Sequence, residues 1–164
     1  MEIINFSILR IHYDSFEDQV LVVSNNVVQL TREHVSSFTI NKNRFVYLDT
    51  EGQDTRFIPG FYEILTETPS YTLYKKHRKK PIKRIDQNTN YFEFFDDNQY
   101  YVHYLDAYHK IKTKRDLLKI FTEFKKEIKA NSKKISHKLD LESYLLNTLP
   151  KINFIKSETA NLEQ

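Results

Sequence analysis

The chain has 164 residues and is 40% hydrophobic and 14% aromatic, so it is too apolar for a disordered protein and long enough for one folded domain. The chain has only two glycines, which excludes a glycine-rich phosphate-binding loop. It has no cysteine, which excludes a disulfide, a thiolate metal site and a cysteine nucleophile. The formal net charge of +3 hides alternating acidic and basic blocks, which favour distinct surfaces for partners.

The N-terminal residues lack the pattern of an export signal. Glu2 follows Met1, and Arg10 comes before any long apolar run develops. No stretch of the sequence approaches the roughly 18 apolar residues of a membrane span. We therefore expect a soluble chain, which is cytoplasmic unless a leader was removed.

Short apolar runs separated by turn residues occupy the first two thirds of the chain. Ile4, Phe6 and Ile8 alternate with polar residues, and a polar break divides the β-branched runs at 19–23 and 27–30. Further runs follow at 36–40, 44–49, 60–67, 70–77, 91–95 and 100–105. This regular spacing predicts an antiparallel meander, either open or partly closed into a barrel.

The apolar period changes from two to 3.6 in the last third of the chain. The apolar stripe of this segment is formed by Leu117, Leu118, Ile120, Phe121, Phe124 and Ile128. Thr113 and Asp116 have the spacing of a capping box, and residues 114–131 could form one helix or two. A further amphipathic helix is predicted from Leu141, with Asp140 as its N-cap.

Strands come first and helices last, which predicts the α+β class. We expect a single α+β domain over residues 1–155. Its β-rich body would span 1–112 and its helical part 113–155. A flexible tail would follow at 156–164.

Four segments follow one another in a recognisable order: "VQLTREHVSSFTI", "FIPGFYEILTETPSYTLYKKHRKK", "YYVHYLDAYHKIKTKRDLLKIFTEFKKEIKANSKKI" and "LESYLLNTLPKIN". Together they resemble an uncharacterised family of envelope or secreted proteins of Gram-negative bacteria. In that family a β-rich body is followed by a longer helix and a short C-terminal helix. The resemblance covers residues 11–153. It implies a periplasmic or secreted location, although the usual export signal is missing here, and it supplies no catalytic or ligand-binding residue.

The segment from Lys75 to Arg84 is the strongest candidate for a binding site. It contains seven basic and no acidic residues: Lys75, Lys76, Arg78, Lys79, Lys80, Lys83 and Arg84. One interpretation is a basic loop that binds a polyanion, namely nucleic acid, lipopolysaccharide or anionic lipid, with Tyr91, Tyr100 and Tyr104 as a possible aromatic face. The other is a solvated strand edge whose charges prevent aggregation.

Other polar groups carry weaker signals. His103 and His109 could approach each other across a tight turn, but this spacing is generic, and we predict no metal site. Glu93 with Asp96 or Asp97 could be read as a glycosidase-like carboxylate pair, whereas a strand end with an acidic turn explains these residues better.

The sequence therefore predicts a non-catalytic interaction module that docks a protein partner, in the bacterial envelope by resemblance. The alternatives are polyanion binding through residues 75–84 and carriage of a small apolar ligand, which a closed barrel could hold. An enzyme ranks third, because the sequence offers no recognisable set of nucleophile, base and oxyanion donors. No cofactor is predicted, and the oligomeric state is left open.

Overall fold

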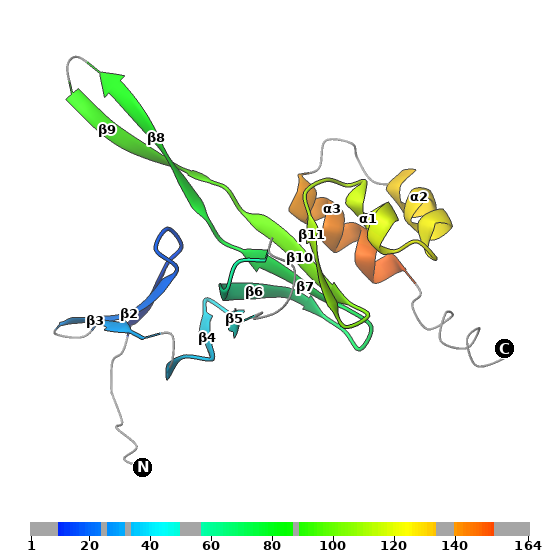
Figure 1. The fold of residues 1–164 in the computed structure, drawn as a ribbon, viewed down its shortest axis with the longest axis horizontal. Coiled ribbons are helices and arrows are strands. Elements are labelled where there is room, and N and C mark those ends of the chain that lie inside the picture. The colour runs from blue at the N-terminus through cyan, green and yellow to red at the C-terminus, as the bar shows by residue number, and fades with distance from the viewer. Residues whose placement is uncertain are drawn as a thin grey trace, which may run out of the picture. The chain divides into compact units, whose positions relative to one another are not determined.

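The computed structural model describes residues 10–23, 26–31, 34–49, 57–86, 89–133 and 140–152 (Figure 1). Within these ranges antiparallel strands precede helices, which confirms the α+β class. The strands are β1 (Arg10–Asp14), β2 (Gln19–Val23), β3 (Val27–Leu30), β4 (Ser37–Ile40), β5 (Asn43–Leu48), β6 (Gly60–Glu67), β7 (Thr72–Lys76), β8 (Lys79–Asp86), β9 (Thr89–Asp96), β10 (Gln99–Tyr104) and β11 (Ala107–Ile111). The helices are α1 (Asp116–Ile120), α2 (Lys125–Lys133) and α3 (Leu141–Thr148), and a 3-10 helix follows at Leu149–Lys151.

The strands in the described ranges form three sheets. One has the order β1-β2-β3, the second has the order β11-β10-β7-β6-β5-β4, and the third consists of β8 and β9 alone. The six-stranded sheet has β4 at one edge and β11 at the other, so it is open and does not close into a barrel. Of the two predicted sheet forms, the open one is therefore correct.

The chain divides into two compact units. Unit 1 comprises residues 1–64 and 75–99, and unit 2 comprises residues 65–74 and 100–164. Strands β6 and β7 belong in part to each unit. The single domain over residues 1–155 stays a prediction. The tail predicted at 156–164, like the N-terminal alternation of Ile4, Phe6 and Ile8, lies outside the described residues.

The apolar core of unit 1 is built from aromatic side chains on neighbouring strands. Phe38 and Phe45 face each other across β4 and β5, and their rings stack with centroids 4.8 Å apart. Phe61 on β6 meets Phe38 edge-on at 5.1 Å, and Val20 on β2 completes the buried cluster. The three-stranded sheet is thus joined to β4, β5 and β6 by apolar packing.

A buried ion pair lies in the same unit. Lys76 is only 3% exposed, and its Nζ is 2.7 Å from Oδ2 of Asp18. The Phe61 carbonyl accepts a hydrogen bond from this Nζ at 3.2 Å, and the Tyr13 hydroxyl donates to Oδ1 of Asp18 at 2.6 Å. Gly60 passes beside the pair with φ +148°, where a Cβ would lie 2.0 Å from Asp18 Oδ2. A side chain at this position would therefore disrupt the pair.

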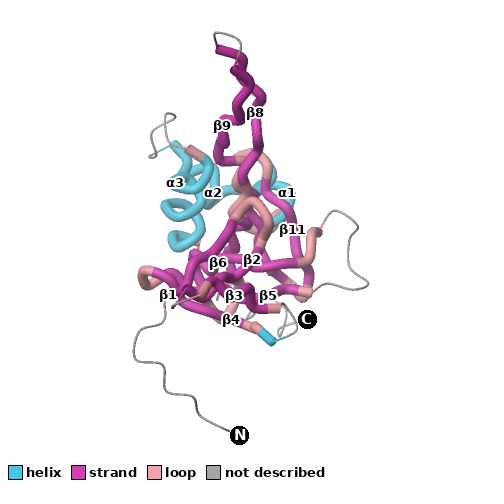
Figure 2. Tube along the Cα trace, turned by 90° about the vertical axis from the view of Figure 1, so that its left-hand side faces the viewer, coloured by secondary structure: helices cyan, strands magenta, loops and turns pink. Residues whose placement is uncertain are grey.

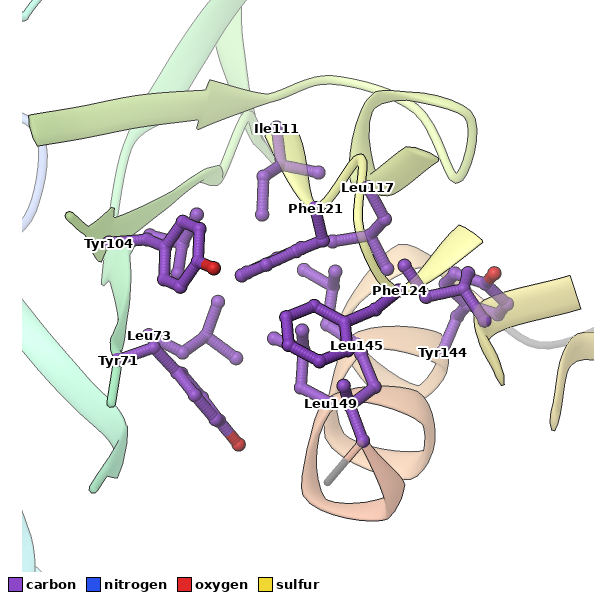
Figure 3. Close-up of a cluster of buried hydrophobic side chains, with 13 residues drawn as sticks. Tyr71, Leu73, Tyr104, Ile111, Leu117, Phe121, Phe124, Tyr144, Leu145 and Leu149 are labelled. Atoms are coloured by element: carbon purple, nitrogen blue, oxygen red, sulfur yellow. The ribbon is translucent and has the colours of Figure 1, made fainter. Parts of the chain in front are cut away.

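The core of unit 2 lies between strands and helices (Figure 3). Tyr104 and Ile111 from the strands, with Tyr71 from the turn before β7, face Phe121 and Leu145 from the helical segment (Figure 3). Phe121 is fully buried, and its ring centroid is 4.7 Å from that of Tyr104. The helices therefore cover apolar strand residues that would otherwise face water.

Residues 114–131 contain two helices rather than one. Helix α1 ends at Ile120, where Phe121 leaves the helical conformation with φ −101° and ψ 64°, and α2 begins at Lys125. Phe121 and Phe124 lie between the two helices, and both belong to the core of unit 2. The predicted N-cap of α3 is confirmed, because Asp140 Oδ1 accepts a hydrogen bond from the Ser143 amide at 2.7 Å.

Two predictions in the middle of the chain are wrong. The loop interpretation of segment 75–84 is wrong, because β7 continues to Lys76 and β8 begins at Lys79; most of the segment is strand, as the alternative interpretation of a strand edge requires. The predicted meander is also interrupted, because the apolar runs at 91–95 and 100–105 follow one another in the chain without pairing: β9 pairs with β8, and β10 lies between β7 and β11. The long basic run conceals a strand because charged residues are poor strand formers, whereas an exposed edge tolerates them.

Candidate functional site

Strands β8 and β9 form a free two-stranded ribbon. Eight residue pairs connect them, from Lys79 opposite Asp96 to Asp86 opposite Thr89, and the two strands run side by side in Figure 2. Neither strand pairs with any other strand in the described part of the chain. Both outer edges of the ribbon therefore present backbone N–H and C=O groups without a strand partner.

The register divides the ribbon side chains between two faces, because alternate residues of a strand point to opposite sides. The first face carries Lys80, Ile82, Arg84, Tyr91, Glu93 and Phe95. The second face carries Lys79, Pro81, Lys83, Ile85, Phe92, Phe94 and Asp96. Each face thus combines apolar side chains with charged ones.

The apolar side chains of the ribbon are exposed. Ile85 is 73% exposed, Phe92 62% and Phe94 52% on the second face, while Tyr91 and Phe95 are exposed on the first. A two-stranded ribbon without a covering layer is only marginally stable in water. Clustered exposed aromatic residues mark interaction sites more often than they mark ordinary surface.

The second face extends onto the turn between β1 and β2. Phe16, in that turn, meets Phe94 edge-on with ring centroids 5.3 Å apart. The turn itself is fixed, because Asp14 Oδ1 accepts hydrogen bonds from the amides of Phe16 and Glu17 at 2.8 and 3.2 Å. Phe16, Ile85, Phe92 and Phe94 are exposed large apolar residues, and we call this set the ribbon patch.

Two of the seven basic residues in the segment are neutralised by carboxylates of the ribbon itself. Lys79 Nζ lies 2.5 Å from Asp96 Oδ1, and Arg84 Nε lies 3.0 Å from Glu93 Oε2. The hydrogen bond and charge of Lys79 lower the pKa of Asp96 below its ordinary value. Lys80 and Lys83 are exposed and, among the described residues, have no carboxylate within ion-pairing distance.

The remaining basic residues are less accessible. Lys76 is buried against Asp18, so its predicted place in a surface site is wrong. Lys75 and Arg78 are half-buried. The Arg78 amide donates to Asn98 Oδ1 at 3.2 Å, and its carbonyl accepts from the Asp97 amide at 2.8 Å. The seven basic residues therefore do not form one exposed cluster.

The predicted aromatic face separates in the same way. Tyr91 is exposed on the ribbon, whereas Tyr104 is buried in the core of unit 2 and cannot stack on a ligand there. Tyr100 is half-buried, and its hydroxyl donates to Glu142 Oε2 at 2.8 Å. Tyr104 turns inward because the helices of unit 2 cover its strand, which the sequence alone does not show.

The weaker chemical candidates are also separated. The register places Glu93 and Asp96 on opposite faces of the ribbon, and it places His103 and His109 on opposite faces of the β10–β11 hairpin. In the described ranges no group of three or more His, Asp or Glu side chains is arranged to hold a metal ion. None of the helices in those ranges is both long and apolar enough to cross a membrane.

The ribbon patch is the feature that the sequence analysis missed. Its signal is present in "YFEFF", where Tyr91, Phe92, Phe94 and Phe95 occupy both parities of one strand. Strict alternation would indicate one covered and one solvated face. Apolar residues of both parities can indicate burial on both sides, so the pattern does not by itself distinguish a buried strand from an exposed one.

Comparisons with known proteins find no match among family models, curated proteins or solved structures. The resemblance to an envelope protein family therefore stays a prediction. The candidate site is defined by its own geometry: a ribbon with exposed aromatic residues on both faces and, within the described ranges, no further strand paired to either edge.

Proposed function

We propose that the protein is a non-catalytic interaction module that docks a partner protein on the β8–β9 ribbon. The observation that carries the proposal is the ribbon patch beside two strand edges that have no strand partner among the described residues. Burying large aromatic side chains is the main source of affinity in protein interfaces. The envelope location within this proposal rests on the family resemblance alone.

The charges on the ribbon favour a protein over a polyanion. Lys79 and Arg84 already bind carboxylates of the ribbon itself, and Lys76 is buried. A polyanion site gains affinity from each phosphate that its cations neutralise, so few free cations support only weak binding. Lys80 and Lys83 instead suit the polar rim of a protein interface, where they would pair with acidic residues of the partner.

The strand edges favour a protein over a lipid surface. Inside a bilayer every backbone polar group must be hydrogen-bonded within the protein, and open sheet edges do not occur there. A protein segment in an extended conformation satisfies the same groups by adding a strand. The geometry therefore supports strand addition with apolar side chains of the partner packed on the ribbon patch.

The edge formed by β9 is better suited to strand addition than the edge formed by β8. Pro81 in β8 has no backbone N–H, so it removes one possible hydrogen bond, whereas Thr89–Asp96 contains no proline. We therefore assign the added strand to β9.

The test is photo-crosslinking in cells that naturally produce the protein, with p-benzoylphenylalanine at Phe92 or Phe94. We expect a discrete adduct from both positions. Leu105, which is 74% exposed in the turn between β10 and β11, is the matched control and should give none. Hydrogen exchange of the purified complex should then show new protection at alternate amides of β9.

Equal crosslinking from Leu105, or no added protection in β9, would contradict strand addition to the ribbon. An adduct of twice the chain mass would identify the partner as a second copy of the protein. Adducts only with nucleic acid or lipid would favour the polyanion alternative and overturn the proposal.

A further inference from the structure

Unit 1 contains a cavity that is separate from the ribbon patch. Its volume is about 580 Å³, and it lies between strand β1 and the β4–β5 hairpin. Small-molecule sites in proteins typically have volumes of about 300–1,000 Å³. The cavity is therefore large enough for a small organic molecule.

Three rings line the apolar part of the cavity. The centroid of Phe45 is 5.3 Å from that of Tyr13 and 5.5 Å from that of His77, and Tyr13 meets His77 edge-on at 6.3 Å. The orientation of the His77 ring is fixed by a hydrogen bond between its Nε2 and the carboxyl group of the buried Glu63. Phe45 is itself buried in the core. These rings form a rigid aromatic wall.

The polar part of the lining consists of groups that can donate hydrogen bonds. Arg10 and His12 lie on one side of β1 and Tyr13 lies on the other, and residues from both sides line the cavity because β1 is at the edge of its sheet among the described residues. Asn41 comes from the β4–β5 turn, and Asn43 is the first residue of β5. The turn is closed by Asn41 in the left-handed conformation, with φ 50°. No aspartate or glutamate is among the described lining residues.

Arg10 gives the cavity its positive charge. It is exposed, and in the part of the chain that the structure describes no carboxylate lies within ion-pairing distance of its guanidinium. A guanidinium presents several donors in a planar fork that matches the oxygen atoms of a carboxylate or a phosphate. Its natural complement here is thus an anionic group of a ligand.

We propose that this cavity binds a small organic anion that has a flat apolar body. The anionic group contacts Arg10 and the amide groups of Asn41 and Asn43, and the body lies against Tyr13 and Phe45. A carboxylate and a phosphate ester share this chemistry. The site goes beyond the proposed docking function, because none of its lining residues belongs to the ribbon patch.

The test compares three probes that have the same ring. The full chain, labelled with ¹⁵N, is titrated with 2-naphthoate, 2-naphthyl phosphate and the neutral 2-naphthalenemethanol. We expect saturable amide shifts at Asn41, Asn43 and His77 with both anions. The neutral alcohol should bind about five-fold more weakly or worse, because it lacks a charge-assisted hydrogen bond.

A matched pair of variants tests the role of the charge. Arg10→Gln should weaken binding of both anions about five-fold or more, whereas Arg44→Gln should leave it within about two-fold. Arg44 precedes Phe45 on β5 but does not line the cavity. Asn43→Ala is a second variant of a lining residue, and we expect it to weaken anion binding by a smaller factor. It replaces Arg10→Gln in the test if the spectrum of Arg10→Gln is no longer that of a folded chain.

Three results would overturn the proposal: no saturable shift with either anion, equal affinity for the neutral alcohol, or equal losses in Arg10→Gln and Arg44→Gln. Tighter binding of one anion would support the proposal and identify the preferred head group. Crosslinking at the ribbon does not depend on this cavity, so failure of the two proposals can be told apart.

Discussion

The ribbon and the core of unit 2 use the same residue types with opposite results. Phe121 is fully buried among strands and helices, whereas Phe92 is 62% exposed on the ribbon. In unit 2 the helices cover the apolar strand residues, as Figure 3 shows, whereas the described residues leave Phe92 and Ile85 of the ribbon uncovered. The difference teaches that an aromatic residue on a strand is buried only where another layer covers it; on the ribbon, the proposed partner would supply that layer.

The two lysine–aspartate pairs of unit 1 make a parallel contrast. Lys76 and Asp18 have side chains that are 4% and 15% exposed, whereas Lys79 and Asp96 are 38% and 66% exposed. Water screens the second pair, so it contributes little to stability. The first pair is held in a low-dielectric setting, where loss of one partner leaves the other uncompensated.

The largest expected effect is in the core of unit 2. Phe121→Ala should lower the free energy of unfolding by about 3–5 kcal/mol, because it removes a fully buried ring and leaves a cavity. Urea denaturation measures the change. Leu105→Ala, at an exposed position of the same unit, is the control and should change stability by about 0.5 kcal/mol or less. A similar loss of unfolding free energy in both variants would contradict the distinction between covered and exposed residues.

The next effect concerns the buried pair. Asp18→Asn should cost about 3 kcal/mol in unfolding free energy, because it leaves the Lys76 charge buried without a counter-ion. Asparagine tolerates the positive φ of 56° at this position, so the backbone is not the cause. The double variant Asp18→Asn with Lys76→Met should recover much of the loss in the same denaturation assay. Failure of this rescue would show that the pair itself does not account for the cost.

A smaller effect is expected at the start of α1. Burial raises the pKa of Asp116, but the hydrogen bonds that it accepts from Thr113 and Lys112 outweigh this and lower the pKa below 3.8. The carboxylate therefore contributes stability above pH 3.8, and the contribution is lost as the pH falls through the lower folded-state pKa. Asp116→Asn should cost about 1 kcal/mol near neutral pH and flatten the acid side of the stability profile.

The control for this prediction is the wild-type profile measured by thermal unfolding between pH 2 and 7. Parallel acid limbs in the wild type and Asp116→Asn would contradict a lowered pKa at this position. Only half of the predicted capping box is present. The Asp116 carboxylate accepts a hydrogen bond from the Thr113 amide, but the Thr113 hydroxyl donates to the same carboxylate at 3.1 Å where a capping box would have it accept from the Asp116 amide.

The smallest effect on stability is expected at the ribbon. Phe92→Ser should change the free energy of unfolding by about 0.5 kcal/mol or less, because the side chain is exposed. The same variant should weaken docking of the partner, which crosslinking from position 94 measures. A large loss of stability would mean that the ribbon aromatic residues support the fold, and unchanged docking would place the interface elsewhere.

Local patterns determined most of the secondary structure. The predicted strand at 60–67 has the bounds of β6, and Asp140 caps α3 as expected, because strand alternation and side-chain capping depend on nearby residues. The loop interpretation of the basic segment is wrong, since its charges conceal β8, which in the described part of the chain pairs with β9 alone. Neither β8 nor β11 was among the predicted strands. Each is a strand because it pairs with a neighbour, β8 with β9 and β11 with β10, although its own residue composition does not indicate one.

By itself, the sequence determined the α+β class, the absence of cysteine chemistry and the presence of many aromatic strand residues. Only the tertiary structure decided which aromatic residues are buried, because burial depends on what covers a strand and not on the strand's own residues. Tyr104 and Tyr91 are the same residue type on strands, yet one is in a core and the other is exposed. Likewise Lys76 and Lys79 differ by three positions, and only the long-range contact with Asp18 separates a buried ion pair from an exposed one.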